Sequence, residues 1–193
     1  MKKFELTTNT KMFLGRKLFQ IKALVSFGDV KEGDLGGYIE KEWNLDHDGD
    51  AWVYGDACVS GDARVSGDAR VYGNAWVSGD AWVYGNARVS GNARVSGDAW
   101  VSGNAWVSGN AWVSGNACVS GDADYATVKG FGREFRNTTF FRCKDSSIEV
   151  VCGCFLGTLQ EFREKVKDTH KNSKMGKEYL MIADLMELHF KED

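Results

Sequence analysis

The side chain with the clearest potential for acid–base chemistry is His47, which stands between Asp46 and Asp48. A histidine can take up and release a proton near neutral pH, and flanking carboxylates can orient its ring. The same pattern also suits a histidine that is simply solvated in a polar turn. The other two histidines, His170 and His189, lie far along the chain. His47 is therefore the one catalytic candidate, although we expect it to be a solvated residue in a polar turn.

A second group with chemical potential lies near the C-terminus. Cys143, Cys152 and Cys154 carry soft sulfur ligands of the kind that bind Zn²⁺. The one-residue spacing of the last two is not a typical zinc pattern. In the predicted strand, Cys152 and Cys154 instead share a face with Val150 and Leu156, and a free cysteine packs as a small hydrophobe. We therefore expect neither a metal nor another cofactor.

The chain that must position these residues is dominated by one repeat. Twelve consecutive hexapeptides over residues 49–120 follow the pattern Gly-[Asp/Asn]-Ala-x-Val-[Ser/Tyr], and a thirteenth keeps only its first three positions. Ala and Val alternate with x, so in a strand they point to one face and x points to the other. Gly followed by Asp or Asn suits a corner. Three hexapeptides, roughly 18 residues, then close one triangular coil with Ala and Val inside.

The outward residues fall into three columns, because every third hexapeptide lies on the same side of such a coil. The predicted columns are Trp52, Arg70, Arg88, Trp106 and Asp124; Cys58, Trp76, Arg94 and Trp112; and Arg64, Trp82, Trp100 and Cys118. Neighbours in a column should lie about 4.8 Å apart, so that Trp and Arg can stack. Such columns can stabilise the sheets as ladders, or they can form a recognition surface. The predicted binding surface comprises Trp52, Trp76, Trp82, Trp100, Trp106, Trp112, Arg70, Arg88 and Arg94.

The corner positions form columns as well. One of them stacks Asp62, Asp80 and Asp98. Stacked carboxylates repel at about 5 Å unless a cation neutralises them, so a Ca²⁺ or Mg²⁺ site is one interpretation. The interpretation that we favour is solvated carboxylates that bond their own turns.

The flanking segments are not repetitive. We predict strands over residues 2–8 and 16–27, an irregular first coil over 33–45, and strands over 134–143 and 148–155. Thr158 and Glu161 match a capping box, so a helix should begin there and end near residue 170. A second helix is expected over 174–190. Its predicted buried face consists of Tyr179, Ile182, Leu185, Met186 and one of His189 or Phe190.

These elements predict three units: an N-terminal β-hairpin cap over residues 1–34, a β-helix over 35–126 and a C-terminal ββαα domain over 127–193. The repeat resembles the hexapeptide of left-handed parallel β-helices, in which an aliphatic residue and a small residue recur as Val53 and Ala57 do here. The flanks look like those of YdcK-like, or polymer-forming, repeat proteins that are common in phages and prophages. The flanking segments that carry this resemblance are 28–40, 44–45, 153–159, 161–162 and 179–180. The resemblance implies a mainly β fold, a left-handed parallel β-helix and a viral origin.

Left-handed β-helices also include trimeric acyltransferases, which as a family use a histidine base between subunits and projecting loops that hold an acyl-CoA. Here no histidine lies within the twelve regular repeats, and no loop is inserted between them. These absences disfavour catalysis. A hexapeptide-repeat acyltransferase with an acyl-CoA donor is kept as the alternative function, with His47 as its candidate base.

Charge and regularity favour a binding protein. The formal net charge is −3, and residues 49–126 hold eight Asp against four Arg, which disfavours nucleic acid. No apolar run approaches the roughly 18 residues of a membrane helix.

The chain has five cysteines, an odd number, and no export signal, which predicts reduced thiols and a cytoplasmic location. If a phage encodes the chain, this is the cytoplasm of the host cell. We expect a non-catalytic protein-binding or scaffold module that forms a closed dimer or trimer. In a phage setting its expected partner is a host defence protein such as a CRISPR effector.

Overall fold

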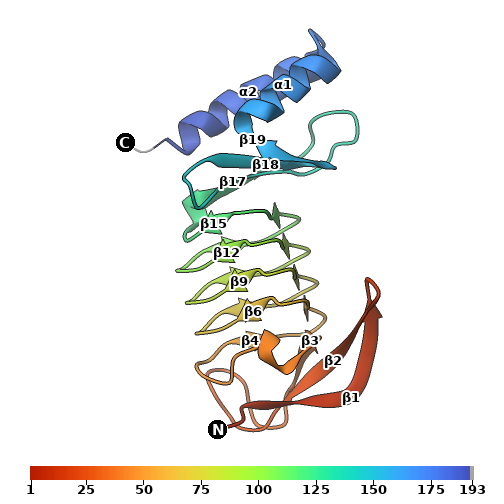
Figure 1. Ribbon diagram of the computed structural model, residues 1–193, viewed down its shortest axis with the longest axis vertical. Helices are drawn as coiled ribbons and strands as arrows, with labels where there is room; N and C mark the ends of the chain where they lie inside the picture. Colours follow the sequence, from red (N-terminus) through yellow and green to blue (C-terminus); the bar gives the residue numbers. More distant parts are fainter. Residues whose placement is uncertain (192–193) are drawn as a thin grey trace.

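Each hexapeptide folds as a two-residue strand followed by a corner. The computed structural model describes residues 1–191, and its ribbon shows coils stacked between two terminal units (Figure 1). The strands pair each outward residue with the following valine. They are β4 (Trp52–Val53), β5 (Cys58–Val59), β6 (Arg64–Val65), β7 (Arg70–Val71), β8 (Trp76–Val77), β9 (Trp82–Val83), β10 (Arg88–Val89), β11 (Arg94–Val95), β12 (Trp100–Val101), β13 (Trp106–Val107), β14 (Trp112–Val113) and β15 (Cys118–Val119).

Parallel pairing of every third strand builds three sheets. We call them face 1 (β4-β7-β10-β13), face 2 (β5-β8-β11-β14) and face 3 (β6-β9-β12-β15). On face 1 Arg88 lies in register with Arg70 on one side and with Trp106 on the other, so each step along a face advances by three hexapeptides. The corner amides of Asn86 and Asn104, 18 residues apart, are hydrogen-bonded between successive coils with the same period. The predicted coil of three hexapeptides and the mainly β solenoid are confirmed.

The interior consists of the repeat's Val and Ala side chains, which are almost completely buried from Ala51 to Val119. The corner glycines permit the coils to stack closely. Gly79 has φ of +71°, and a Cβ atom there would lie 2.9 Å from the backbone nitrogen of Gly97 in the next coil. A larger residue there would meet both backbone strain and a clash. Positive φ recurs at the glycine that opens each of the twelve hexapeptides, which explains why glycine occupies this position.

The N-terminal unit joins the solenoid through face 2. Strands β1 (Phe4–Phe13) and β2 (Arg16–Ala23) form an antiparallel hairpin that projects beside the coils, and β3 (Leu35–Ile39) pairs antiparallel with β2 and parallel with β5 (Figure 1). The short 3₁₀ turn η1 (Glu42–Asn44) follows. The first strand is longer than predicted, because the hairpin turns only at Leu14 and Gly15, both with positive φ. The second strand ends at Ala23 and is shorter than predicted.

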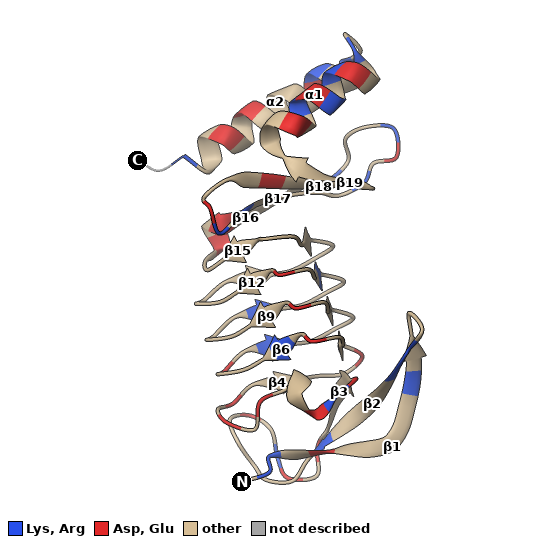
Figure 2. Cartoon of the chain, viewed as in Figure 1, with Lys and Arg blue, Asp and Glu red and all other residues tan. Residues whose placement is uncertain are grey.

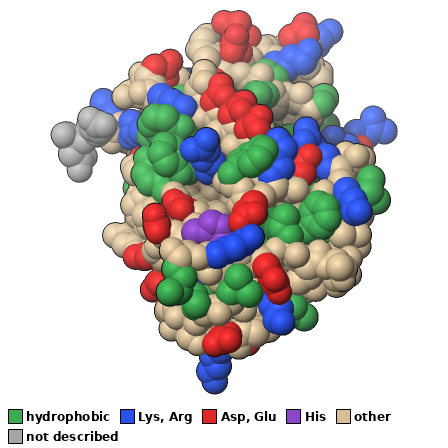
Figure 3. All heavy atoms as spheres, turned by 60° about the horizontal axis from the view of Figure 1, so that its bottom comes forward, with side chains coloured by type: hydrophobic (Ala, Val, Ile, Leu, Met, Phe, Trp, Pro, Cys, Tyr) green, Lys and Arg blue, Asp and Glu red, His purple; other side chains and the backbone are tan. Residues whose placement is uncertain are grey.

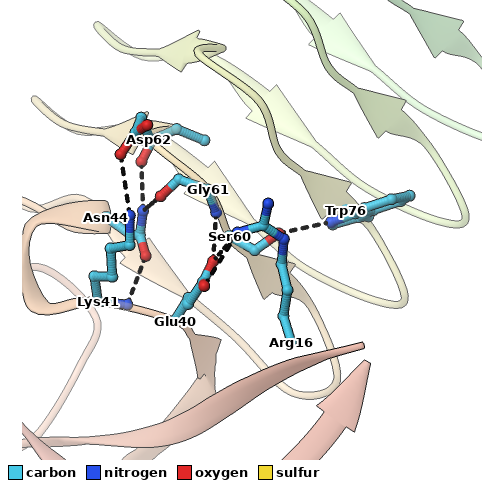
Figure 4. A network of polar contacts seen from close by, with 9 residues as sticks. Arg16, Glu40, Lys41, Asn44, Ser60, Gly61, Asp62 and Trp76 are labelled. Carbon is cyan, nitrogen blue, oxygen red and sulfur yellow. Dashed lines mark hydrogen bonds and ion pairs between the residues drawn. The ribbon is translucent and has the colours of Figure 1, made fainter. Parts of the chain in front are cut away.

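At the lower end of the solenoid, side chains supply the hydrogen bonds of a missing coil. Within the stack, the carbonyls of Gly79 and Ala81 accept backbone N–H groups from the preceding coil. At the end of the stack, the Asn44 amide donates to the carbonyls of Gly61 and Ala63, at 3.1 and 2.8 Å (Figure 4).

At another corner of this end, the Lys3 ammonium donates to the carbonyls of Gly49 and Ala51, at 3.1 and 3.0 Å. Burial lowers the pKa of Lys3, while nearby aspartates, Asp46 first among them, act in the opposite direction. One amide and one ammonium thus close equivalent repeat positions at two corners.

The C-terminal unit covers the other end. After the 3₁₀ turn η2 (Asp122–Asp124), strands β16 (Tyr125–Val128), β17 (Thr138–Arg142), β18 (Ile148–Cys152) and β19 (Phe155–Thr158) form one antiparallel sheet. Helices α1 (Leu159–His170) and α2 (Lys174–His189) pack on it around Phe140, Phe162 and Tyr179 (Figure 1). Phe141, Cys143 and Val151 belong instead to the core of the solenoid.

Several predictions about this unit were wrong in detail. The sheet has four strands rather than two, because Tyr125–Val128 leaves the repeat and pairs with β17, and because Gly153, with φ of +63°, turns the predicted strand 148–155 back on itself. The strand predicted over 134–143 begins only at Thr138. Both helices and the Thr158 cap are confirmed, but Leu185 is exposed and Ala183 takes its place in the core.

The buried Asn44 side chain gives the first prediction. Asn44→Ala should lower the free energy of unfolding by about 3 kcal/mol, because two buried carbonyls lose their donors. Chemical denaturation followed by circular dichroism measures this loss. Asn74 is exposed at a regular corner, so Asn74→Ala is the matched control and should change stability by less than about 0.5 kcal/mol. Equal effects of the two substitutions would show that Asn44 does not cap the solenoid.

Glu149 on β18 places a carboxylate at the junction between the C-terminal unit and the last coil. Its Oε2 atom is buried and has no hydrogen-bond partner among the described residues, and a Cβ atom on Gly115 would lie 3.0 Å from it. Burial raises the pKa of Glu149, and the charges of Asp145 and Glu161 add to this effect, whereas the Cys143 thiol opposes it. Burial and the Glu149 charge likewise raise the pKa of Cys143 to about 12, so that sulfur stays a thiol.

This raised pKa predicts how stability depends on pH. The folded state holds the Glu149 proton more tightly than the unfolded state, so its contribution is fully present below pH 4.5 and is lost as the pH rises through the folded pKa. Glu149→Gln should therefore stabilise the protein at pH 8, by no more than about 1 kcal/mol because water screens a partly buried side chain, and have little effect at pH 4. Thermal melts of this variant and of the exposed control Asp168→Asn across that range provide the check. A pH-independent effect of Glu149→Gln would contradict the assignment.

Candidate functional site

The three predicted columns of outward residues are confirmed by the strand registers. Face 1 aligns Trp52, Arg70, Arg88 and Trp106; face 2 aligns Cys58, Trp76, Arg94 and Trp112; face 3 aligns Arg64, Trp82, Trp100 and Cys118. The predicted last member of the first column, Asp124, lies in η2 instead of a strand.

Two of the predicted surface tryptophans lie under the N-terminal unit. Trp52 is only 1% exposed, with the rings of Phe4 and Phe27 packed edge-on against it at 6.2 and 5.4 Å. Trp76 is half-buried beneath Phe13 of the hairpin, at 5.3 Å. Assigning Trp52 to a binding surface was therefore wrong, because the N-terminal unit that covers it comes from outside the repeat.

The remaining repeat tryptophans are partly exposed, and most also stabilise the coils. Trp82, Trp100, Trp106 and Trp112 are exposed by 40, 38, 46 and 37%. The indole N–H groups of Trp82 and Trp106 donate to Ser66 and Ser90, each 16 residues earlier, at 3.0 and 2.9 Å. Trp76 and Trp112 make the same bond to Ser60 and Ser96.

On face 2 the Arg94 guanidinium lies between the rings of Trp76 and Trp112, at 6.0 and 5.7 Å. The guanidinium therefore makes cation–π contacts with both rings. Trp76 and Trp112 therefore serve mainly as ladder members, in line with the stabilising interpretation of the columns.

Trp100 is the exception to the Trp–Ser rule. Tyr84 occupies the position before it that serine holds before the other four tryptophans. The Trp100 ring packs edge-on against Trp82 at 6.3 Å, and the Lys144 ammonium lies 4.0 Å from its centroid.

Face 3 carries two adjoining hollows. The larger, about 480 Å³, is lined by Trp43, His47, Arg64 and Trp82 together with Glu42 and Asp46. The smaller, about 300 Å³, shares Arg64 and Trp82 with it and continues along the sheet to Trp100. We call the surface formed by Trp43, Arg64, Trp82 and Trp100 the tryptophan groove.

Trp43 in η1 is 58% exposed and was missed by the sequence analysis. It stands outside the repeat and in no column, so no periodic signal marked it. Its position becomes apparent only when η1 folds against the first coil.

The charges around the tryptophan groove have both signs. Lys41 pairs with Asp62 at 3.1 Å and lies 4.8 Å from the Trp43 ring, and Lys2 pairs with Glu42. Hydrogen bonds from Lys2 and His47 hold the pKa of Glu42 below its ordinary value. Arg64 has no hydrogen bond or ion pair through its side chain with any residue of the described range 1–191.

Figure 3, which views the lower end of the molecule, shows apolar, basic and acidic side chains intermixed. Figure 2 shows that both signs also alternate on the helices, while acidic residues line the solenoid corners. Neither view shows the continuous basic stripe that a nucleic acid requires.

His47 is engaged at both ring nitrogens. Its Nδ1 accepts the backbone N–H of Lys3 at 3.1 Å, so Nε2 carries the proton and donates to Glu42 at 3.0 Å. The ring also stacks on Phe4 at 4.4 Å. A general base needs a free lone pair that faces a substrate, and this arrangement does not provide one. The prediction of a simply solvated turn was also wrong, because His47 ties the N-terminus to the first coil.

The residues considered as candidate metal ligands are not brought together. No group of three His, Cys, Asp or Glu side chains within the described residues has a geometry that could hold a metal ion. Asp62 is paired with Lys41, and this corner column, which includes Asp80 and Asp98, forms no cluster of that kind.

The cysteine candidates are dispersed as well. Cys143 is buried in the solenoid core. Cys152 packs against the core of the C-terminal unit and accepts a hydrogen bond from Thr138 at 3.2 Å. Cys154 is exposed in the turn after β18, so its predicted place on the same strand face as Cys152 was wrong.

Comparison with known families identifies the repeat. The model of the YdcK β-solenoid repeat matches residues 63–79, 69–85, 81–97, 87–103 and 99–115, all within the regular coils. The coils form a YdcK-like β-solenoid. A search of the curated proteins finds no match. No helix in the part of the chain that the structure describes has the length and apolar character needed to cross a bilayer.

The different settings of the tryptophans in this solenoid predict different responses to truncation. Trp52→Ala should lower the free energy of unfolding by about 4 kcal/mol, since it leaves a large cavity beneath the hairpin. Trp82→Ala, which removes a partly exposed ring and one hydrogen bond, should cost only about 1 kcal/mol. Urea denaturation of both variants distinguishes a core residue from a surface residue. Comparable losses would mean that Trp82 also belongs to the structural core.

Proposed function

We propose that this protein is a non-catalytic protein-binding module whose partner docks on the tryptophan groove. The observation that carries the proposal is that three exposed tryptophans, together with Arg64, line two adjoining hollows on one rigid face. Exposed aromatic area of this kind is usually covered by a partner, and Trp and Arg dominate interface energies.

The class of partner is also part of the proposal. The mixed charges around the groove suit a protein surface better than a polyanion. The resemblance to phage and prophage repeat proteins supports a host protein, for example a defence protein such as a CRISPR effector, as the target. A second copy of the chain is the other candidate, in a closed dimer or trimer, since both solenoid ends are covered and only the sides remain for association. The engaged nitrogens of His47 lend no support to the acyltransferase alternative.

The groove can be tested with tryptophans of equal exposure on different faces. Trp100 in the groove and Trp112 on face 2 are exposed by 38 and 37%. We expect Trp82→Ala and Trp100→Ala to weaken binding of a partner isolated from bacterial lysate by about thirtyfold. Trp112→Ala should change it less than about threefold. Titration calorimetry with the purified partner measures each affinity, and thermal melts verify that the variants fold.

Light scattering on the same variants tests the second-copy arm of the proposal. If the groove binds another copy, the wild type should be a dimer or trimer at micromolar concentration, and Trp100→Ala should dissociate it. A monomeric wild type that also retains its partner in both groove variants would remove the basis of the proposed function.

A further inference from the structure

A pair of side chains recurs on face 1 in two successive coils. Tyr54 closes one hexapeptide and lies beside Arg70 of the next coil, with the same spacing that relates each serine to its tryptophan in the Trp–Ser bonds. Tyr72 and Arg88 have this spacing one coil further on. Because the coils repeat in register, the two Tyr–Arg pairs occupy equivalent positions on the sheet.

The lower pair holds a carboxylate from the chain itself. Asp29, in the loop after β2, accepts a hydrogen bond from the Tyr54 hydroxyl at 2.9 Å and another from the Arg70 guanidinium at 3.0 Å. The Tyr54 hydrogen bond, followed by the arginine, lowers the pKa of Asp29, whereas burial and this carboxylate raise the pKa of Tyr54 to about 12. One phenol and one guanidinium thus bind an ionised carboxylate at this repeat position.

The upper pair makes no such contact within the chain. Neither Tyr72 nor Arg88 forms a hydrogen bond or ion pair with another side chain in residues 1–191. The two pairs and Asp29 line a common hollow of about 330 Å³. Arg88 also lies directly opposite Arg70 across the sheet, a like-charge arrangement that an anion at Arg88 would relieve.

We propose that Tyr72 and Arg88 form a carboxylate clamp for an Asp or Glu side chain of a protein partner. The template is the Asp29 carboxylate, itself a side chain, one coil below. The strand beyond Arg88 presents Trp106, 46% exposed, so an apolar residue next to the acidic one would lie on an indole ring. The clamp lies on a different face from the tryptophan groove and rests on the proposed function only in taking its ligand from a protein.

The surroundings disfavour larger anions at this clamp. Asp29 places a negative charge in the same hollow, and residues 49–126 carry eight Asp against four Arg. A phosphate dianion or a nucleic-acid backbone would therefore be repelled more strongly than a single carboxylate. A charge-assisted hydrogen bond from arginine, joined by a phenol, matches one carboxylate.

Nuclear magnetic resonance of the arginine Nε–Hε groups tests the clamp. The probes are N-acetylated, amidated Glu-Leu and Gln-Leu dipeptides, which differ in the carboxylate alone, together with sodium acetate and sodium chloride at equal ionic strength. We expect Glu-Leu to shift the Arg88 signal with an affinity about tenfold higher than Gln-Leu. Tyr72→Phe and Arg88→Met should abolish this preference.

Arg94→Met is the matched control, because Arg94 is an outward arginine with Ser78 at the position that tyrosine holds in the two pairs. It should leave the Arg88 response unchanged. If acetate binds as tightly as Glu-Leu, the clamp takes a free small carboxylate and the protein-partner assignment is overturned. A chloride response equal to that of the dipeptide, or a preference that survives Tyr72→Phe, would overturn the clamp itself.

Asp29 provides a gain-of-function test. Asp29→Ala should free Tyr54 and Arg70, so that the Arg70 signal, unresponsive in the wild type, shifts with Glu-Leu as the Arg88 signal does. Failure of Arg70 to respond in a folded variant would show that the Tyr–Arg pair is not sufficient. These outcomes are independent of the groove, since loss of partner binding in Trp82→Ala or Trp100→Ala can be observed whether or not the clamp exists.

Discussion

The structure depends on one constraint, which is that a stack of hydrogen-bonded coils leaves unsatisfied backbone groups at both ends. Below the first coil, Asn44 and Lys3 donate to carbonyls that would otherwise lack partners. Above the last coil, the backbone N–H of Trp106 donates to the Asp122 carboxylate, and the backbone N–H of Trp112 donates to the Thr139 hydroxyl. Exposed ladder ends would recruit further strands, so these side chains and the units that carry them limit the solenoid to a finite length.

The same ladder sets what the faces can do. Since Val and Ala fill the interior and glycines form the corners, the outward position takes no part in closing the coil and is free to vary. Outward residues of adjacent strands in a column are held at the strand spacing, about 4.8 Å, by the backbone. Some outward residues use this spacing to stabilise one another, as Arg94 does between Trp76 and Trp112. On face 3, Trp82 and Trp100 instead line adjoining hollows. The surroundings of an outward residue, rather than its type, therefore separate a ladder member from a candidate binding surface.

The repeat could be interpreted from the sequence because its period is unbroken, so that the columns, the core and the strand register follow from counting. The terminal units could not be placed in this way. Trp52 has the same repeat position as Trp106, yet one is 1% exposed and the other 46%, because Phe4 and Phe27 reach the first coil from a segment without periodicity. For the same reason Trp43 was not recognised as part of the groove. Splitting of the predicted strand at Gly153 depended on a positive φ that no hydrophobic pattern encodes.

Departures from the consensus carry the information about binding in such a protein. Serine closes most hexapeptides, and four of these serines accept a hydrogen bond from an indole N–H. Tyrosine closes three hexapeptides, at residues 54, 72 and 84. Tyr54 donates a hydrogen bond to Asp29. The Tyr84 ring packs against the Trp82 ring in the groove, with their centroids 4.9 Å apart. Tyr72 has no such partner within the described residues, although its place in the repeat is that of Tyr54. One Tyr–Arg pair of the repeat binds the Asp29 carboxylate. Because the equivalent pair one coil away has the same geometry, we expect it to bind the same chemical group.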